Sequence, residues 1–300
     1  LIGVSSFVLT FKINNLKYFN DFKEEIRKNI GEVKVVYTDL DGTILNNKGC
    51  LIADHEGRQF LEAVDLLENL SLKNIDVVLV SGRSRMQLRY NAQMMNLKNY
   101  IAEIGCEVVY DLGREAHLTY EKSRLRHDFA SLGPDMDAIA DLLKKAFPMK
   151  IDYKADWNRY RTTNILFLGE VDLAKANRLL EENGYGDSVL VNNGATELYP
   201  VNLNVSKLYL YNLMPKGVDK STGIKLDKKI RGLSEKNCIA LGDSLEDLKM
   251  ATEVSYFFLM NNDLHEEKDV LEALPEYENV YITEKKMNRG WAEVISFLFE

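Results

Sequence analysis

The sequence has few of the residues that build disulfide frameworks or zinc sites. Its 300 residues include three cysteines, Cys50, Cys106 and Cys238, which lie far apart and form no C-x-x-C pair. An odd number at this spacing argues against a disulfide framework and a structural zinc site. The four histidines are scattered too, so no ligand pair at i, i+4 spacing stands out. A reducing cytoplasm is the simpler expectation for such a chain.

Long apolar runs and clusters of positive charge are also missing. No apolar run reaches the roughly 20 residues that a membrane-spanning helix needs. The apolar start, residues 1–11, lacks the basic leader and small-residue cleavage site of a signal peptide. The net charge is -8 and no long Lys/Arg run occurs, which disfavours broad nucleic-acid binding. We therefore expect a globular monomer or small homo-oligomer that binds neither membrane nor nucleic acid.

Strand-like and helix-like segments alternate over much of the chain. The strand-like runs are 33–38, 75–80, 238–241 and 256–260, and the helical segments are 58–72, 84–96, 216–231, 245–251 and 290–299. This βα alternation predicts an α/β fold with a Rossmann-like parallel sheet covered by helices on both faces. In such sheets ligands bind at the carboxyl ends of the strands.

The middle of the chain has a different, mixed α+β pattern. Helical periodicity at 131–147 and 172–182 is interleaved with strand-like runs at 150–153, 162–168, 189–191 and 197–199. Because the βα pattern flanks this region on both sides, it reads as an inserted domain. The predicted organisation is an N-terminal extension of unassigned role at 1–32, a core formed by 33–110 and 204–300, and an inserted α+β cap at 111–203.

Two aspartates follow the first predicted strand. The segment Asp39-Leu40-Asp41-Gly42-Thr43 begins where the run 33–38 ends. Like charges this close repel each other and raise one pKa. A divalent cation removes that penalty, and a hard oxygen site suits magnesium. An Asp-rich turn is the structural alternative, since Asp-Gly is a common turn pair.

Three further segments place polar residues at strand ends or helix starts. Gly242-Asp243-Ser244-Leu245-Glu246-Asp247 follows a strand and opens a helix, where acids also suit the macrodipole. Ser81-Gly82-Arg83 follows the second strand and could hold a phosphate oxygen, or Ser81 could simply be a helix N-cap. The segment 216–223 carries lysines near a helix start, where a solvated surface position is the alternative.

The order of these four segments resembles the haloacid dehalogenase superfamily of phosphohydrolases over most of residues 33–300. The insertion between the Ser81 and Lys220 segments is similar to the Cof-like and sucrose-phosphatase-like branch, which has a large α/β cap (subclass IIB). Residues 101–107 resemble the entry to that cap, where the family often has Asn-Gly-Ala. Residues 290–295 resemble the closing helix of sucrose-phosphatase-like and mannosyl-phosphoglycerate-phosphatase-like members.

The resemblance implies a division of roles around a phosphate. Asp39 corresponds to the nucleophile that forms an aspartyl-phosphate, and Asp41 to the general acid/base. Ser81 and Gly82 correspond to the phosphate-binding segment, and Lys220 to the lysine that steadies the phosphate and the nucleophile.

The resemblance also implies a magnesium ion. Its ligands would be Asp39, the backbone carbonyl of Asp41, and Asp243, with Asp247 supporting or joining them. The implied activity is a magnesium-dependent phosphatase acting on a sugar phosphate or another small phosphorylated metabolite. A phosphomannomutase-like phosphomutase and a non-catalytic phosphate-binding regulatory protein are the alternatives.

Some positions depart from the family pattern. Lys220 is followed by Ser221 where the family usually has Lys-Gly, so Lys216 and Lys207 stay open as rivals. Glu246 stands where the family often has Asn. In the cap, the candidates for contact with the leaving group are Lys154, Arg159, Arg161 and the turn 192–194, although a solvated surface is the simpler interpretation of each.

Overall fold

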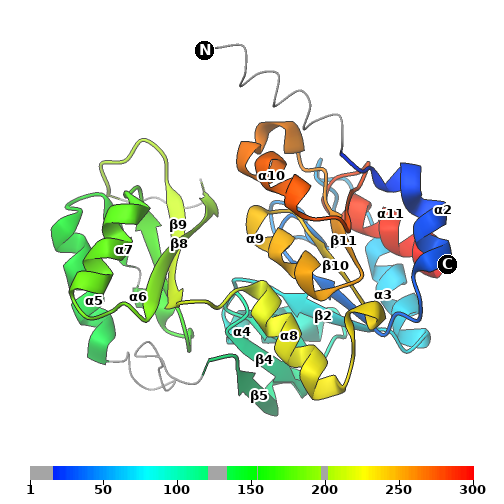
Figure 1. The fold of residues 1–300 in the computed structure, drawn as a ribbon, viewed down its shortest axis with the longest axis horizontal. Helices are drawn as coiled ribbons and strands as arrows, with labels where there is room; N and C mark the ends of the chain where they lie inside the picture. The colour runs from blue at the N-terminus through cyan, green and yellow to red at the C-terminus, as the bar shows by residue number, and fades with distance from the viewer. Residues whose placement is uncertain (1–15, 121–133, 154, 197–201) are drawn as a thin grey trace.

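Two β-sheets organise the chain (Figure 1). The computed structural model describes residues 16–120, 134–153, 155–196 and 202–300. The larger sheet has eight strands in the order β12-β11-β10-β1-β2-β3-β4-β5, and the smaller has four in the order β6-β7-β9-β8. The prediction of an α/β core with a second, inserted α+β unit is confirmed.

The larger sheet is parallel from β12 to β3 and ends in an antiparallel hairpin. Its strands along the chain are β1 (Val35–Thr38), β2 (Asp76–Val80), β3 (Tyr100–Ala102), β4 (Glu107–Tyr110), β5 (Glu115–Leu118), β10 (Cys238–Gly242), β11 (Tyr256–Leu259) and β12 (Val280–Ile282). Thr38, the last residue of β1, pairs with Leu241 on one side and Leu79 on the other. This register brings the loops after β1, β2 and β10 to one edge of the sheet.

Helices cover both faces of the larger sheet. Helices α2 (Phe19–Asn29), α3 (Glu62–Leu72), α4 (Arg85–Met94) and α11 (Met287–Phe299) contribute to one buried cluster, and α8 (Lys220–Arg231), α9 (Leu245–Leu248) and α10 (Lys268–Ala273) contribute to the other. The strands between them are rich in buried Val, Ile, Leu and Phe, as expected for a sheet covered on both sides.

The described part of the N-terminal extension is part of this core. Phe19 of α2 is fully buried and stacks edge-on against Phe258 of β11, with ring centroids 5.4 Å apart. Tyr18 forms an isolated bridge to Ile282 of β12. Residues 16–30 therefore extend the hydrophobic core, although their sequence carries none of the family's motifs.

The smaller sheet forms the cap. Its strands are β6 (Ile151–Tyr153), β7 (Ile165–Gly169), β8 (Ser188–Ala195) and β9 (Tyr209–Pro215), and its helices are α5 (Pro134–Ala146), α6 (Ala155–Asn158) and α7 (Leu173–Glu182). Helices α5 and α7 lie on the side of the sheet away from the core (Figure 1).

The two sheets divide the chain later than the predicted cap boundaries 111–203. Strand β5, which ends at Leu118, pairs with β4 in the core sheet, and β9, which begins at Tyr209, is an inner strand of the cap sheet. Short polar-flanked strands such as Glu115–Leu118 carry little sequence signal, which explains the difference. The strand predicted at 197–199 lies outside the described residues.

Helix α8 begins at Lys220 rather than at the predicted residue 216. Gly217 has φ +82° and the side chain of Asp219 accepts a hydrogen bond from the backbone N–H of Thr222, so the chain turns before the helix starts.

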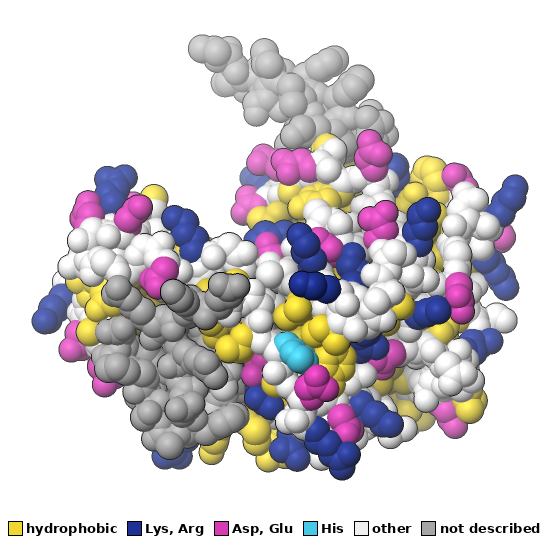
Figure 2. Space-filling view, turned by 60° about the horizontal axis from the view of Figure 1, so that its bottom comes forward, with side chains coloured by type: hydrophobic (Ala, Val, Ile, Leu, Met, Phe, Trp, Pro, Cys, Tyr) yellow, Lys and Arg dark blue, Asp and Glu magenta, His cyan; other side chains and the backbone are white. Residues whose placement is uncertain are grey.

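In the part of the chain that the structure describes, no helix is both long and apolar enough to cross a bilayer. Figure 2 shows Lys and Arg side chains interspersed with Asp and Glu on one face of the molecule.

Candidate active site

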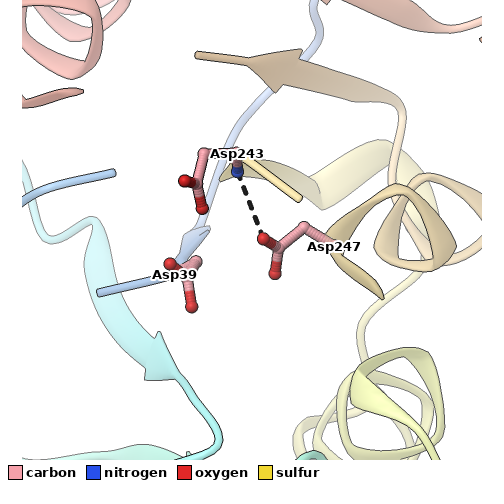
Figure 3. A group of neighbouring side chains, drawn as sticks. All are labelled: Asp39, Asp243 and Asp247. Carbon is pink, nitrogen blue, oxygen red and sulfur yellow. Dashed lines mark hydrogen bonds between the residues drawn. The ribbon is translucent and has the colours of Figure 1, made fainter. Parts of the chain in front are cut away.

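Three aspartates meet at the carboxyl edge of the core sheet (Figure 3). Asp39 directly follows β1, Asp243 directly follows β10, and Asp247 lies in α9. One carboxylate oxygen from each lies within 4.8 Å of the others, and Asp39 and Asp247 are buried. The parallel register therefore brings together acids that are more than 200 positions apart in the sequence.

Lys220 is the cation inside this cluster. Its Nζ donates to Oδ1 of Asp39 at 2.6 Å and also to Oδ1 of Asp247, and the residue is only 5% exposed. Lys216 and Lys207 are exposed, and Lys207 lies over the ring of Tyr209. Among the three lysines left open by the sequence, the structure thus brings Lys220 to the carboxylate of Asp39.

The cluster contains more negatively charged groups than positively charged ones. Burial raises the pKa of Asp39 to about 7, opposed by Lys220 and reinforced by Asp247. Burial and the neighbouring carboxylates hold the pKa of Asp243 well above its ordinary value. The two aspartates beside Lys220 raise its pKa despite burial. Three carboxylates facing one ammonium leave an excess of negative charge that suits a divalent cation.

Asp247 has both carboxylate oxygens occupied by protein donors. Oδ1 accepts from Lys220, while Oδ2 accepts from the backbone N–H groups of Asp243 and Ser244 and from the Ser244 hydroxyl, at 3.1, 3.0 and 2.6 Å. A Cβ on Gly242 would lie 2.4 Å from that of Asp247, so a glycine is needed there. Asp247 is therefore placed to orient its neighbours.

Asn262 is a site residue that the sequence analysis missed. Its Nδ2 donates to the carbonyl of Gly42 at 2.7 Å and to Oδ2 of Asp243 at 3.1 Å, so it links the loop after β1 to the loop after β10. The only signal in the sequence was a polar Asn-Asn-Asp run after a predicted strand.

Oδ2 of Asp39 and Oδ1 of Asp243 accept no hydrogen bond from any residue that the structure describes, which makes them the available metal ligands.

Ser81 and Gly82 form the loop after β2. Ser81 is buried, and its Oγ accepts from the backbone N–H of Arg83 at 3.2 Å. The N-cap of α4 is Ser84, which forms a capping box with Gln87. Ser81 is thus not the helix cap, and the structural alternative raised for it from the sequence does not apply.

The Asp41 carboxylate lies apart from the three-aspartate cluster. Arg83 holds it in a two-pronged contact, with Nε to Oδ2 at 2.8 Å and Nη2 to Oδ1 at 2.5 Å, and Nη1 of Arg83 donates to Asn91. The Asp41 side chain is half exposed. Such a fork fixes the carboxylate in one orientation, so Arg83 controls where the predicted acid/base group points.

The cap reaches this edge of the core at Gly82. Nη1 of Arg161 donates to the carbonyl of Gly82 at 3.1 Å, and Nδ2 of Asn193 lies 3.3 Å from where a Cβ on Gly82 would be. Of the other cap cations named from the sequence, Arg159 is exposed and Lys154 lies outside the described residues.

An α/β core with an inserted cap is the fold that this chain shares with solved haloacid dehalogenase-like hydrolases. The family model that matches the chain, over residues 36–128 and 144–280, is that of haloacid dehalogenase-like hydrolases. The chain belongs to this family, as the motifs predicted, and it is an enzyme of the phosphatase class.

Proteins similar to this chain in sequence or in fold are named as phosphatases. The glucosyl-3-phosphoglycerate/mannosyl-3-phosphoglycerate phosphatase of Persephonella marina is 25% identical over 235 residues, covering 73% of this chain and 82% of that protein. Phosphoglycolate phosphatase 1 of Saccharolobus solfataricus is 26% identical over 270 residues, covering 89% and 96%. The sucrose-phosphatase of Synechocystis sp. PCC6803, solved with sucrose and phosphate, shares the fold with a TM-score of 0.59 at 13% identity, covering 89% and 98%.

Proposed function

We propose that the protein is a magnesium-dependent phosphatase of small phosphorylated metabolites that works through an aspartyl-phosphate on Asp39. The observation that carries this proposal is the buried contact of Lys220 with both Asp39 and Asp247 beside Asp243. A nucleophilic carboxylate held by an ammonium, next to two further acids, suits in-line attack on a phosphorus atom.

The residues divide the chemistry between them. Asp39 attacks phosphorus, and Lys220, which donates to its Oδ1, offsets the negative charge of the carboxylate and of the incoming phosphate. Ser81 and the backbone N–H groups of its loop bind phosphoryl oxygens. Asp41 gives a proton to the leaving oxygen and later takes one from the water that hydrolyses the acyl phosphate. For this, its carboxylate has to turn from Arg83 toward the phosphate.

The donor set fits magnesium. Asp39 and Asp243 would bind the ion directly, together with the backbone carbonyl of Asp41, while Asp247 and Asn262 would orient those ligands. When bound, magnesium would neutralise charge on the phosphoryl group and on the acids around it. Carboxylate and carbonyl oxygens are the ligands that this hard cation prefers.

Phosphate release tests the proposal. The protein should hydrolyse p-nitrophenyl phosphate and a panel of sugar and hydroxy-acid phosphates with magnesium, and a chelator should stop the reaction. Asp39→Asn should abolish turnover. Release that survives this substitution would contradict the assignment of Asp39, and isomerisation of a hexose phosphate without phosphate release would instead identify a phosphomutase.

The names of the relatives narrow the substrates worth testing first. The proteins of Persephonella marina and Saccharolobus solfataricus are named as phosphatases of substituted 3-phosphoglycerates and of phosphoglycolate. Both substrates carry a carboxylate close to the phosphate. We therefore place hydroxy-acid phosphates beside sugar phosphates in the panel.

A further inference from the structure

The cap contains a group of buried polar side chains whose hydrogen bonds are incomplete. Asn164 and Asn212 are fully buried and Arg161 is 8% exposed. Nε of Arg161, Nδ2 of Asn164 and both amide atoms of Asn212 have no hydrogen-bond partner among the residues that the structure describes. Unsatisfied buried polar groups cost stability, so their presence in a folded protein calls for an explanation.

These side chains lie on the face of the cap sheet that looks toward the core. On β9, Met214 contacts Ile104 and Cys106 of the core, and Asn212 points to the same face because it is two residues away. Leu213 points to the opposite face, where it packs with residues of α5 and α7. The face that carries Asn212 is therefore the one turned toward the catalytic edge (Figure 1).

Asn164 and Asn212 lie close together on that face. Leu166 of β7 pairs directly with Asn212 of β9, and Asn164 is two residues before Leu166. Diagonal neighbours of this kind are within reach of one ligand. Oδ1 of Asn164 already accepts from Nη1 of Arg161 at 2.7 Å, so Arg161 and Asn164 are linked directly, and the strand register places Asn212 beside Asn164.

Arg161 places the cluster beside the phosphate loop. Its Nη1 also donates to the carbonyl of Gly82, the residue after Ser81. A leaving group attached to a phosphate bound at Ser81 would extend from this loop, and the cap is the domain that faces it. The cluster is thus positioned to contact the leaving group rather than the phosphate.

No described carboxylate forms an ion pair with Arg161. Glu103 is fully buried and binds the loop that follows Arg161. Its oxygens accept from the backbone N–H groups of Thr162, Thr163 and Asn164, at 2.8, 2.8 and 3.0 Å, and from the Thr163 hydroxyl at 2.6 Å. Glu103 therefore fixes the loop that carries Arg161 and Asn164, and the guanidinium has no carboxylate bound to it in the described part of the chain.

The unpaired atoms specify the chemistry of a ligand. Arg161 and Asn164 offer donors only, which suits an anion, while Asn212 offers one donor and one acceptor, which suits a hydroxyl. We propose that Arg161, Asn164 and Asn212 bind the leaving group and select phosphoesters of hydroxy acids, with the carboxylate at Arg161 and Asn164 and a neighbouring hydroxyl at Asn212. This inference rests on the proposed phosphatase function and goes further by naming the substrate class.

Paired substrates test the carboxylate. 3-Phosphoglycerate and glycerol 3-phosphate differ by a carboxylate in place of a hydroxymethyl group, so the ratio of their kcat/KM values isolates that contact. We expect the ratio to favour 3-phosphoglycerate by about 10- to 100-fold, as for a buried hydrogen bond to a charged group. Arg161→Gln should bring the ratio close to one, and Arg161→Lys should retain part of it.

Arg159→Gln is the matched control. Arg159 is a cap arginine two positions away with an exposed side chain, so its substitution removes the same charge from the cap without touching the cluster. Its ratio should stay within about two-fold of that of the parent protein. An equal fall in both variants would overturn the proposal, because a general loss of positive potential would then explain it.

A second pair tests the hydroxyl. 3-Phosphoglycerate should be favoured over 3-phosphooxypropanoate, which lacks the 2-hydroxyl, by about 3- to 10-fold, as for a neutral hydrogen bond. Asn212→Leu should abolish this preference and at the same time raise the melting temperature, because it removes an unpaired buried amide. A purely structural asparagine would lose stability on this change, and that result would count against the subsite.

Binding measurements separate this inference from the proposed function. Hydrolysis of p-nitrophenyl phosphate with magnesium reports on the phosphatase itself. Calorimetric titration of the inactive Asp39→Asn variant with 3-phosphoglycerate and glycerol 3-phosphate reports on the subsite without turnover. Equal affinities for the two, or a stronger Arg161-dependent preference for a sugar bisphosphate, would overturn the hydroxy-acid assignment even if the phosphatase activity is found.

Discussion

At the scale of single residues, Lys220 links the charge of the site to the stability of the fold. Its Nζ is the only described ammonium in contact with Asp39 and Asp247. Lys220→Met should leave two buried carboxylates without their partner and lower the free energy of unfolding by about 3 kcal/mol at neutral pH. The rate of phosphate release should fall as well. Urea unfolding measures the stability and a phosphate assay measures the rate. Lys216→Met, at an exposed lysine nearby, should change neither the stability nor the rate.

Asp41 can be tested through the leaving group. An alkyl alcohol needs a proton to leave, whereas p-nitrophenolate leaves readily without one. Asp41→Asn should therefore reduce turnover of alkyl phosphates by about 100-fold or more, within the range for general acid catalysis, and reduce formation of the aryl phosphoenzyme much less. Burst kinetics with p-nitrophenyl phosphate measure that first step. Equal losses with both leaving groups would show that Asp41 is not the acid.

At the scale of elements, the approach of the segment after β3 to the start of α8 places Lys220. Gly105 has φ +87°, and a Cβ there would lie 1.8 Å from the carbonyl oxygen of Asp219. Gly105→Ala should displace the start of α8 and cost both stability and turnover. Gly217 has a similar φ, +82°, with nothing within 4 Å of its Cβ position. Gly217→Ala should therefore lower the free energy of unfolding only through backbone strain at positive φ, by about 1 kcal/mol. Thermal melts of the two variants then distinguish the steric clash at Gly105 from backbone strain alone.

The sequence predicted the elements whose pattern is local. The βα alternation and the motif loops after β1, β2 and β10 were recognisable because buried parallel strands are continuous apolar runs. Strand β5 was not recognisable because it is short and flanked by polar residues, and the inner position of β9 was not because its pairing with the distant β7 leaves no periodic signal. Asn262 was missed for the same reason: its contacts to Gly42 and Asp243 depend on which loops the sheet brings together.

The choice among three lysines shows which part of the site could not be predicted from the sequence. Lys207, Lys216 and Lys220 each stand near a plausible motif. Lys220 points inward because α8 starts directly after its cap Asp219 and because Gly105 packs against the carbonyl of Asp219. Side-chain direction of this kind is set by tertiary packing, so sequence spacing left it open.

At the scale of the whole molecule, the junction of core and cap contains a pH-sensitive acid. Glu107 of β4 is 3% exposed, and burial raises its pKa from 4.5 to about 7 in spite of Arg85, whose Nη1 lies 3.0 Å from Oε1. A raised folded-state pKa favours the protonated form, so the stability that Glu107 contributes is fully present below about pH 4.5 and is lost as the pH rises through about 7.

Glu107→Gln should remove this dependence. Relative to the parent protein, the variant should gain free energy of unfolding between pH 5 and pH 8, by an amount on the order of 2 kcal/mol. Chemical unfolding at several pH values measures the difference, in which other titrating groups cancel. Glu68→Gln, at an exposed glutamate of α3, should give a flat difference. If the stability difference between Glu107→Gln and the parent protein is also independent of pH, Arg85 keeps this carboxylate ionised throughout.

Magnesium should stabilise the whole fold because the excess of negative charge at the catalytic edge is buried between elements from both halves of the core. A ligand that binds only the folded state adds about 2.7 kcal/mol of stability at 100 times its dissociation constant. We therefore expect a higher melting temperature with magnesium than with chelator. Asp243→Asn should abolish the shift, since it removes one of the two carboxylates with a free oxygen, whereas Asp269→Asn at an exposed acid of α10 should retain it. Because the same substitution relieves repulsion in the metal-free protein, Asp243→Asn should also melt higher than the parent in chelator. If magnesium leaves the melting temperature of the parent protein unchanged, the metal site is contradicted, whatever an assay of turnover shows.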